Sequence, residues 1–449
     1  MDSQFSNILY KTSEANFERK WASFLEFFSM GALFKIDLSR PDEKLDDVEK
    51  ATKTRLMQIR QIVNQVACYG DEALSHFTNA FDKIELRPPQ FAITGKEMES
   101  AHKKIDPALM KTIRSAIENV RKYQTEIFIG NKPFPAGIRY TPIARVGICV
   151  PGASAPLPST VIMTAVPAQV AGVKEIAVVS PPRYEGSIHP VILAVCFELG
   201  IKEVYRIGGA QAVAALAFGT QTIRKVDKVV GPGNQWVSLA KKEVFGVVDI
   251  DSIAGPSEVL IIADENANPA WVAADMLSQA EHDPGSSAVL LTTSEKLAKT
   301  VLTQLDTQVK QLKRSEQTAE SLSQCSKIII ARNMEEIVRL ADEFAPEHLQ
   351  IQCGSQSKAV AQKITNAGAI FIGEYSPVAV GDYWAGPSHT LPTGQSARFF
   401  SALSSNDFIK ATSIIEYDKQ KLAKSAADII RLAQTEGLDA HARSVSIRT

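Results

Sequence analysis

The sequence predicts an α/β protein with two Rossmann-like parallel-sheet domains, a helical N-terminal region and a helical C-terminal tail. Short runs rich in valine and isoleucine have the length and β-branched content of buried strands. They fall into two groups, at 145–150, 174–180, 203–207 and 227–230, and at 258–263, 288–292, 327–331 and 369–372. Helical segments separate the runs, and this alternation favours parallel sheets covered by helices.

The helices are predicted from the spacing of apolar residues. Those between the strands lie at 189–199, 211–218, 236–244, 269–282, 295–312, 334–344 and 357–366. Before the first strand, 48–70 closes on a glycine and 98–128 predicts one or two further helices. After Phe400 we expect a helical tail, clearest at 425–434, with so few apolar residues that it packs on something else.

These groups divide the chain into four expected parts. They are an N-terminal arm at 1–45, a first α/β domain from 46–148 plus 257–400, a second Rossmann-like domain at 149–256, and a C-terminal tail at 401–449. We expect the metal and catalytic residues in the first α/β domain and the cofactor on the side of the second.

The composition is that of an ordinary globular chain. It has 449 residues, 45% hydrophobic and 22% charged, and 49 Lys and Arg against 50 Asp and Glu give a formal net charge of -1. No overall charge favours nucleic acid or anionic lipid, so neither partner is expected. The five cysteines form no C-x-x-C pair, which suits a reducing compartment. With no signal peptide at the N-terminus, we expect a cytoplasmic protein.

One uncharged stretch, 146–173, is longer than the roughly 20 residues that span a bilayer. Pro151, Pro156, Pro158 and Pro167 interrupt it, so a helix facing lipid would lose several backbone hydrogen bonds. We therefore interpret the stretch as a strand, a turn and a buried helix, and expect no membrane span.

Glycine-rich segments follow three predicted strands, at 150–156, 208–212 and 231–234. Each precedes a helix, so backbone N–H groups and a helix N-terminus can face an anion such as a dinucleotide pyrophosphate. No complete G-x-G-x-x-G motif is present, because Trp236 stands where the third glycine would be. One such loop is more often a plain turn, but three at successive strand ends favour a nucleotide site.

Gln279 and His282 lie three residues apart near the end of a predicted helix that Pro284 stops. On one helical face their side chains could converge on a metal ion. On this pattern alone a solvated helix end is slightly favoured, because histidine is favourable near a helix C-terminus without any metal.

Glu347 and His348 are adjacent behind Pro346, and we expect them in a loop at a sheet edge. A carboxylate beside an imidazole is a plausible pair of general bases. An ordinary surface pair is the alternative on pattern alone.

Two further segments carry acids and histidines. The segment 381–389 holds glycines, aromatic residues, Asp382 and His389, and a loop so dense is rarely only a connector. Near the C-terminus, Glu436 and His441 lie five residues apart with Gly437 between them. A tail usually carries no site, so the second segment is weak evidence by itself.

Together these motifs resemble the histidinol dehydrogenase family over nearly the whole chain. They are GDEAL at 70–74, VPG at 150–152, GGAQ at 208–211, GPGN at 231–234, AGPSE at 254–258, SQAEH at 278–282, PEH at 346–348 and GDY at 381–383. Motifs in family order are far more specific than any one of them. The resemblance implies oxidation of L-histidinol through L-histidinal to L-histidine, the last step of histidine biosynthesis, with two NAD and one zinc ion per subunit.

The resemblance also implies roles for individual residues. The implied zinc ligands are Gln279, His282, Asp382 and His441, and the implied catalytic pair is Glu347 and His348. The positions that match contacts to histidinol are Ser257, Gln279, His282, His348, Asp382, Glu436 and His441. The cofactor-binding positions are Cys149, Gln211 and Asn234. The family places the tail across a two-fold interface, so a homodimer with shared active sites is expected.

The sequence departs from the family pattern at the cofactor mouth and in one early helix. Cys149 stands where the family usually has a tyrosine, and Ala153 replaces the second glycine of the usual Pro-Gly-Gly. A Phe-His pair of the family is also absent, with Lys122 and Tyr123 nearest to its place.

The family mechanism implies that zinc positions the substrate, that His348 accepts the hydroxyl proton, and that Glu347 activates a water for the second oxidation. Two rival functions remain open. One is a paralogue that oxidises another small polar alcohol such as sulfopropanediol. The other is a zinc-binding α/β protein without catalysis, against which the intact Glu347–His348 pair argues.

Overall fold

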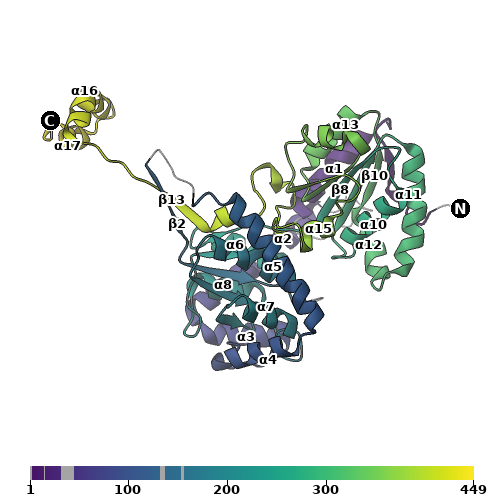
Figure 1. The fold of residues 1–449 in the computed structure, drawn as a ribbon, viewed down its shortest axis with the longest axis horizontal. Coiled ribbons are helices and arrows are strands. Elements are labelled where there is room, and N and C mark those ends of the chain that lie inside the picture. The colour runs from purple at the N-terminus through teal and green to yellow at the C-terminus, as the bar shows by residue number, and fades with distance from the viewer. Residues whose placement is uncertain (1–2, 15, 32–44, 132–136, 153–155) are drawn as a thin grey trace. The chain divides into compact units, whose positions relative to one another are not determined.

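The structure is a computed structural model that describes residues 3–14, 16–31, 45–131, 137–152 and 156–449. The chain divides into two compact units (Figure 1). The first unit comprises Met1–Phe128 and Pro142–Phe408, and the second comprises Ile129–Thr141 and Ile409–Thr449. The first unit contains two parallel sheets. Residues 32–44 of the expected N-terminal arm, and Ala153 of the expected cofactor mouth, lie outside the described residues.

The first sheet has five parallel strands in the order β5-β4-β3-β6-β7. Its strands are β3 (Arg145–Cys149), β4 (Glu175–Val179), β5 (Glu203–Tyr205), β6 (Lys228–Val230) and β7 (Asp249–Ile250). Ile148 of β3 pairs with Val178 on one side and Val230 on the other. Every residue of β3 and β6 is buried, as expected for a parallel sheet with helices on both faces.

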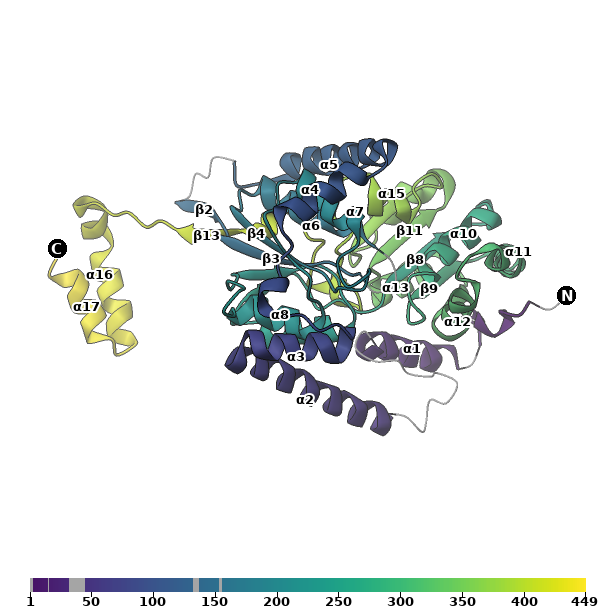
Figure 2. The same cartoon turned by 90° about the horizontal axis from the view of Figure 1, so that it is seen from below.

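Helices from two parts of the chain cover this sheet. Those between its strands are α6 (Pro158–Val170), α7 (Pro190–Glu198), α8 (Gly209–Phe218) and α9 (Gln235–Val244). Those before it are α2 (Leu45–Tyr69), α3 (Asp71–Asp82), α4 (Gly95–Lys104) and α5 (Pro107–Ile127). Figure 2 shows α2 and α3 beside α8, and α4 and α5 on the side of α6 and α7, in agreement with their contacts.

The packing of α2 to α5 differs from the expected grouping of 46–148 with 257–400. These helices pack on the helices of the five-stranded sheet, because their apolar faces join its core. Ile59, Val66 and Leu74, for example, are buried in one cluster with Val213 and Leu216 of α8. Sequence patterns show that a helix has an apolar face, but they do not show which sheet that face covers.

The uncharged stretch 146–173 contains most of β3 and the buried helix α6, in agreement with the expected strand and helix, and residues 153–155 of the expected turn lie outside the described residues. Among the described residues, no helix is both long and apolar enough to cross a membrane.

The second sheet has six parallel strands in the order β1-β10-β9-β8-β11-β12. Its strands are β1 (Leu9–Lys11), β8 (Glu258–Ala263), β9 (Ser287–Thr292), β10 (Lys327–Ile330), β11 (His348–Gln352) and β12 (Ala369–Ile372). Neither β1 nor β11 was expected from the sequence. In β11 the polar residues Gln350 and Gln352 are buried, and both donate hydrogen bonds to Asp275 of helix α10 (Pro269–Ala280), at 2.7 and 2.8 Å.

Side chains alternate between the two faces of this sheet. Val259 and Ile261 of β8 pack in one cluster with α10 and α11, whereas Leu260 and Ile262 pack in another with α1 and α13. Figure 1 shows α10 to α12 on one side of the sheet and α1 and α13 on the other. The helices of this region are α1 (Phe17–Gly31), α10 (Pro269–Ala280), α11 (Glu295–Gln308), α12 (Ser315–Cys325), α13 (Met334–Phe344), α14 (Ser357–Ala361) and α15 (Val378–Tyr383).

Short 3-10 helices complete the first unit. They are η1 (Ser6–Ile8), η3 (Pro88–Gln90), η4 (Val309–Gln311), η5 (Gly354–Gln356), η6 (Ser396–Arg398) and η7 (Ser405–Phe408).

The second unit pairs β2 (Ile138–Pro142) with β13 (Ile409–Ser413) and ends in α16 (Lys419–Thr435) and α17 (Asp439–Ser446). Its two helices bury only Ala426, Ala433 and Ala442. Larger apolar residues stay exposed, among them Ile415 at 83% and Ile447 at 69%. The second unit therefore has almost no core of its own.

Candidate active site

A cavity of about 470 Å³ opens within the first unit. The five-stranded sheet lines it with residues at the carboxyl ends of its strands, such as Cys149, Val179 and Asn234. The six-stranded sheet lines it with residues at the amino ends of its strands, such as Glu258 and His348. The usual rule that ligands bind at carboxyl ends therefore holds for the first sheet and not for the second.

The predicted catalytic pair lies at the start of β11, with Glu347 in the bend before this strand and His348 within the sheet. His348 is the first residue of β11 and pairs with Val259 of β8 and Ala369 of β12. Both members of the pair are nearly inaccessible, with Glu347 5% and His348 4% exposed. The alternative of an ordinary surface pair does not agree with this burial.

One residue, Glu258, holds both members of the pair through its backbone. Its N–H donates a hydrogen bond to Glu347 Oε2 at 2.7 Å, and its carbonyl oxygen lies 2.9 Å from His348 Nδ1. A carbonyl oxygen only accepts, so Nδ1 of His348 carries a hydrogen. Nε2 of His348 has no hydrogen-bond partner among the described residues and lies 3.8 Å from Asp382 Oδ1.

The charges around His348 decide its protonation. Burial disfavours the charged ring, but the carboxylates of Glu347 and Asp382 outweigh burial and raise the pKa of His348 to about 10. For Asp382 burial also opposes the charged form, yet the neighbouring His348 keeps the pKa of this carboxyl below its usual value. Positive charge held beside Asp382 would lower the pKa of His348 and favour the neutral ring that can accept a proton.

The expected metal ligands come from separate places. Gln279 lies in the last turn of α10 and is 1% exposed, with no hydrogen-bond partner for its Nε2 among the described residues. The helix ends at Ala280, so His282 lies in the turn after it rather than on one helical face with Gln279. His282 is exposed and lines the same cavity as Asp382 of α15. Within the described ranges, no three His, Cys, Asp or Glu side chains form a group that could hold a metal ion.

The residue types of Gln279, His282 and Asp382, an amide, an imidazole and a carboxylate, would nevertheless suit zinc with one position still to fill. Gln279 would contribute its amide oxygen to such a set, because the buried Nε2 group that lacks a partner among the described residues is a hydrogen-bond donor and cannot bind a cation. The fourth expected ligand, His441 in α17, belongs to the second unit, as does Glu436 at the end of α16. Both are exposed there.

The glycine loops line the cavity opposite the catalytic pair. Gly231 has a positive φ of 107°, and a Cβ there would lie 2.3 Å from the carbonyl oxygen of Cys149. Asn234 caps α9 by accepting hydrogen bonds from the N–H groups of Trp236 and Val237. Gln211 is buried in α8, and its Oε1 has no partner among the described residues. Burial raises the pKa of the Cys149 thiol to about 12, so this cysteine is a packing residue at the cavity wall.

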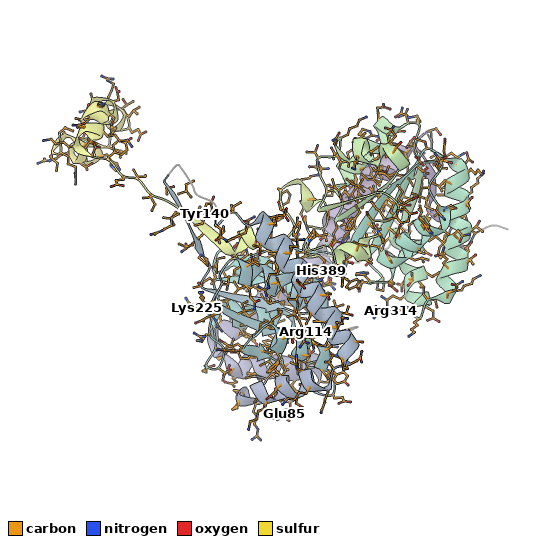
Figure 3. The ribbon with its side chains drawn as sticks, in the orientation of Figure 1. Glu85, Arg114, Tyr140, Lys225, Arg314 and His389 are labelled. Carbon is orange, nitrogen blue, oxygen red and sulfur yellow. The ribbon has the colours of Figure 1, made fainter. Side chains whose placement is uncertain are left out.

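Sequence reasoning did not assign a role to two titratable residues that line the cavity. His389, labelled in Figure 3, lies with its Nε2 3.3 Å from Ser159 Oγ, and burial lowers its pKa. Glu258 starts a strand that is otherwise entirely apolar, and it is 2% exposed. An acid at the head of such a strand was the signal that could have identified Glu258.

Comparisons with known proteins agree with the motifs. A family model described as histidinol dehydrogenase matches residues 45–449. A histidinol dehydrogenase of Rhodopirellula baltica is 49% identical over 398 residues, which cover 87% of this chain and 86% of the relative. One from Bacillus subtilis is 45% identical over 407 residues, covering 89% and 95%. A crystal structure of histidinol dehydrogenase from Elizabethkingia anophelis aligns with a TM-score of 0.85 at 35% identity, over 98% of this chain and 97% of that one. The resemblance and the α/β fold class are thus confirmed.

Proposed function

Because this chain belongs to the histidinol dehydrogenase family, an oxidoreductase family of histidine biosynthesis, we propose that it is the zinc- and NAD-dependent enzyme that makes L-histidine from L-histidinol. The reaction passes through bound L-histidinal and removes two hydrides. The observation that carries the proposal is the buried Glu347–His348 pair, which faces glycine-rich strand ends across one cavity.

His348 is the base for the first oxidation. Its Nδ1 hydrogen is engaged by the Glu258 carbonyl, so the proton of the substrate hydroxyl goes to Nε2 as hydride leaves the carbinol carbon. Nε2 faces the cavity side on which Asp382 lies, and it has no competing hydrogen bond among the described residues.

Glu347 is the base for the second oxidation, which needs an added water. One of its oxygens, Oε2, accepts the N–H of Glu258 and is held in place. The carboxylate then takes a proton from the water that attacks the aldehyde, and the hydrated aldehyde gives up the second hydride. Two bases that are held differently suit two different proton transfers.

NAD is proposed to bind along the carboxyl ends of the five-stranded sheet. The loops after β3, β5 and β6 line the cavity, and α8 and α9 begin beside them. Backbone N–H groups at these helix starts suit the pyrophosphate of the cofactor. Gln211 and Asn234 are the proposed polar contacts, and Cys149 contributes its apolar surface.

The metal ligands are proposed to be Gln279, His282 and Asp382, completed by His441 of α17. Zinc bound there would position the substrate and favour the neutral ring of His348. With Ser257 and Glu436, the same side chains are the proposed contacts to histidinol. Because the second unit buries so little of its own surface, we also propose a homodimer in which each tail completes the partner's site.

A stoichiometric assay tests the proposal. Purified protein with zinc, L-histidinol and NAD should form two NADH for each L-histidine, measured by absorbance and chromatography. Sulfopropanediol is the competing substrate in a parallel assay. Turnover of sulfopropanediol alone would show a paralogue, and no turnover of either alcohol would show a zinc-binding protein without catalysis.

Metal removal tests the ligand assignment separately. Chelation should abolish turnover but leave the helical circular dichroism, because the proposed ligands lie near the ends of α10 and α15 and in the tail. Asp382→Ala should lower the amount of zinc bound per subunit, measured by atomic absorption. Loss of most helical signal on chelation would instead show a structural metal.

A further inference from the structure

Glu258 is the residue that joins the two catalytic bases. It is the first residue of β8, and the N–H and the carbonyl oxygen of this one residue bond Glu347 and His348, respectively. Any shift of the backbone at Glu258 therefore moves both bases. A misplacement of about 1 Å can cost roughly 10²-fold in rate, so the position of Glu258 matters for the chemistry.

The hydrogen bonding of the Glu258 side chain is that expected of an uncharged carboxylic acid. Its Oε1 accepts one hydrogen bond, from the N–H of Gly394 at 2.7 Å, and its buried Oε2 has no partner among the described residues. A buried carboxylate anion needs several donors or a cation. Glu336, which is buried to a similar degree, has them: Arg332 lies 2.6 Å away, and Thr12 donates a hydroxyl hydrogen bond.

The two charged groups beside Glu258 act in opposite directions: Glu347 disfavours a second negative charge, and His348 opposes this effect more weakly. The charged groups that act on it are Glu347 and His348, both at the start of β11. The segment after Thr393 offers it a backbone N–H only, and the adjacent strand β9 begins with Ser287. Other titratable side chains also line the cavity, namely His282, Asp283, Asp382, His389, Tyr383, Cys149 and Cys325. Two carboxylates in one buried place do not both ionise readily.

We propose that Glu258 is a positioning residue whose side chain stays uncharged at neutral pH, so that it anchors β8 at Gly394 and leaves the negative charge to Glu347. Its Oε2 then carries a hydrogen and can donate to a group in the cavity. Burial, and secondly the charge of Glu347, raise the pKa of Glu258 to about 8, in agreement with the geometry. Only the kinetic consequence of this inference rests on the proposed function.

The first experiment measures stability and needs no substrate. A carboxyl whose pKa rises from 4.5 to about 8 on folding holds its proton more tightly in the folded protein. Its contribution to stability is therefore full below pH 4.5 and is lost as the pH rises to about 8. Glu258→Gln cannot ionise. As the pH rises across this range, its melting temperature should therefore increase relative to that of the wild type by roughly 2 °C or more.

Glu336→Gln is the matched control for this experiment. Burial raises the pKa of Glu336, but the bonds from Arg332 and Thr12 prevail and lower it to about 2, so this carboxyl stays ionised in the folded protein from pH 4.5 to 8. The control should be less stable than the wild type by an amount that stays constant over this range. If the melting temperatures of Glu258→Gln and the wild type change by the same amount from pH 4.5 to 8, the proposal is overturned.

The second experiment measures turnover of histidinol. Glu258→Gln should keep kcat within about threefold of the wild type near neutral pH, whereas Glu258→Ala should lose roughly 10²-fold. The glutamine variant should also keep its rate at pH values above about 8, where the wild type declines because Glu258 ionises beside Glu347. Equal loss in both variants would show that the carboxyl must carry charge or transfer a proton. If the protein does not oxidise histidinol at all, the proposed function fails and the melting experiment still decides this inference.

Discussion

Glu347 and His348 are neighbours in the chain, but their side chains are held for different tasks. His348 has one ring nitrogen engaged by a backbone carbonyl and the other without a partner among the described residues. Glu347 has one oxygen fixed by a backbone N–H. This difference supports the proposed roles, in which the histidine takes the proton of an alcohol and the glutamate takes the proton of a water.

Substitution of each base should therefore damage a different half-reaction. Glu347→Gln should slow the oxidation of histidinal far more than the first hydride transfer, whereas His348→Asn should slow the first step. The loss of one general base typically costs roughly 10²–10⁴-fold. Single-turnover measurements with histidinol and with histidinal separate the steps. Equal damage to both half-reactions by Glu347→Gln would contradict this assignment.

At the scale of secondary-structure elements, the turn before β12 fixes the backbone of Glu347. Gly368 donates its N–H to Pro346, and Ala369 donates to the carbonyl oxygen of Glu347, both at 2.9 Å. A Cβ on Gly368 would lie 2.6 Å from that carbonyl oxygen. The turn has no room for a side chain, so it fixes the backbone of Glu347 directly before β11.

Gly368→Ala should consequently lower both activity and stability. The steric conflict should push Glu347 from its place, lower kcat and reduce the free energy of unfolding by about 1–3 kcal/mol. Gly95→Ala is the control, because a Cβ at this first residue of α4 meets nothing within 4 Å. Denaturant unfolding and steady-state kinetics measure both effects. Wild-type kcat in Gly368→Ala would show that this turn does not position the base.

On the scale of the whole molecule, the proposed site needs residues from both units. Glu347, His348 and Asp382 belong to the first, whereas Glu436 and His441 belong to the second, which leaves large apolar residues such as Leu432 exposed. An exposed apolar surface of this kind favours association with another chain. The proposed homodimer, with each tail at the partner's site, accounts for both observations.

Mixing two inactive variants tests the shared site. His441→Ala and the double variant Glu347→Gln/His348→Asn should each be inactive alone. Once their subunits exchange, one site of each heterodimer has all its residues while the other collects both defects, so up to about half of one dimer's activity should return. The control is the same mixture under conditions without exchange. No recovery in verified heterodimers would show that His441 serves its own chain.

The sequence by itself determined the α/β class, most strands and the family, because these follow from local patterns. Runs of β-branched residues predict buried strands wherever they lie, and eight motifs in family order identify histidinol dehydrogenase. The stretch 146–173 could be interpreted correctly because its prolines act on their own backbone.

Only the tertiary structure decided how the elements meet. The strand β11 has polar residues at alternate positions, and their burial depends on Asp275 of α10, which lies far away in the sequence. The packing of α2 to α5 on the five-stranded sheet depends on which apolar faces fit together. The place of Glu258 between the two bases depends on strands that pair across distant parts of the chain. Such contacts are non-local, so the physical information that specifies them is absent from any single segment.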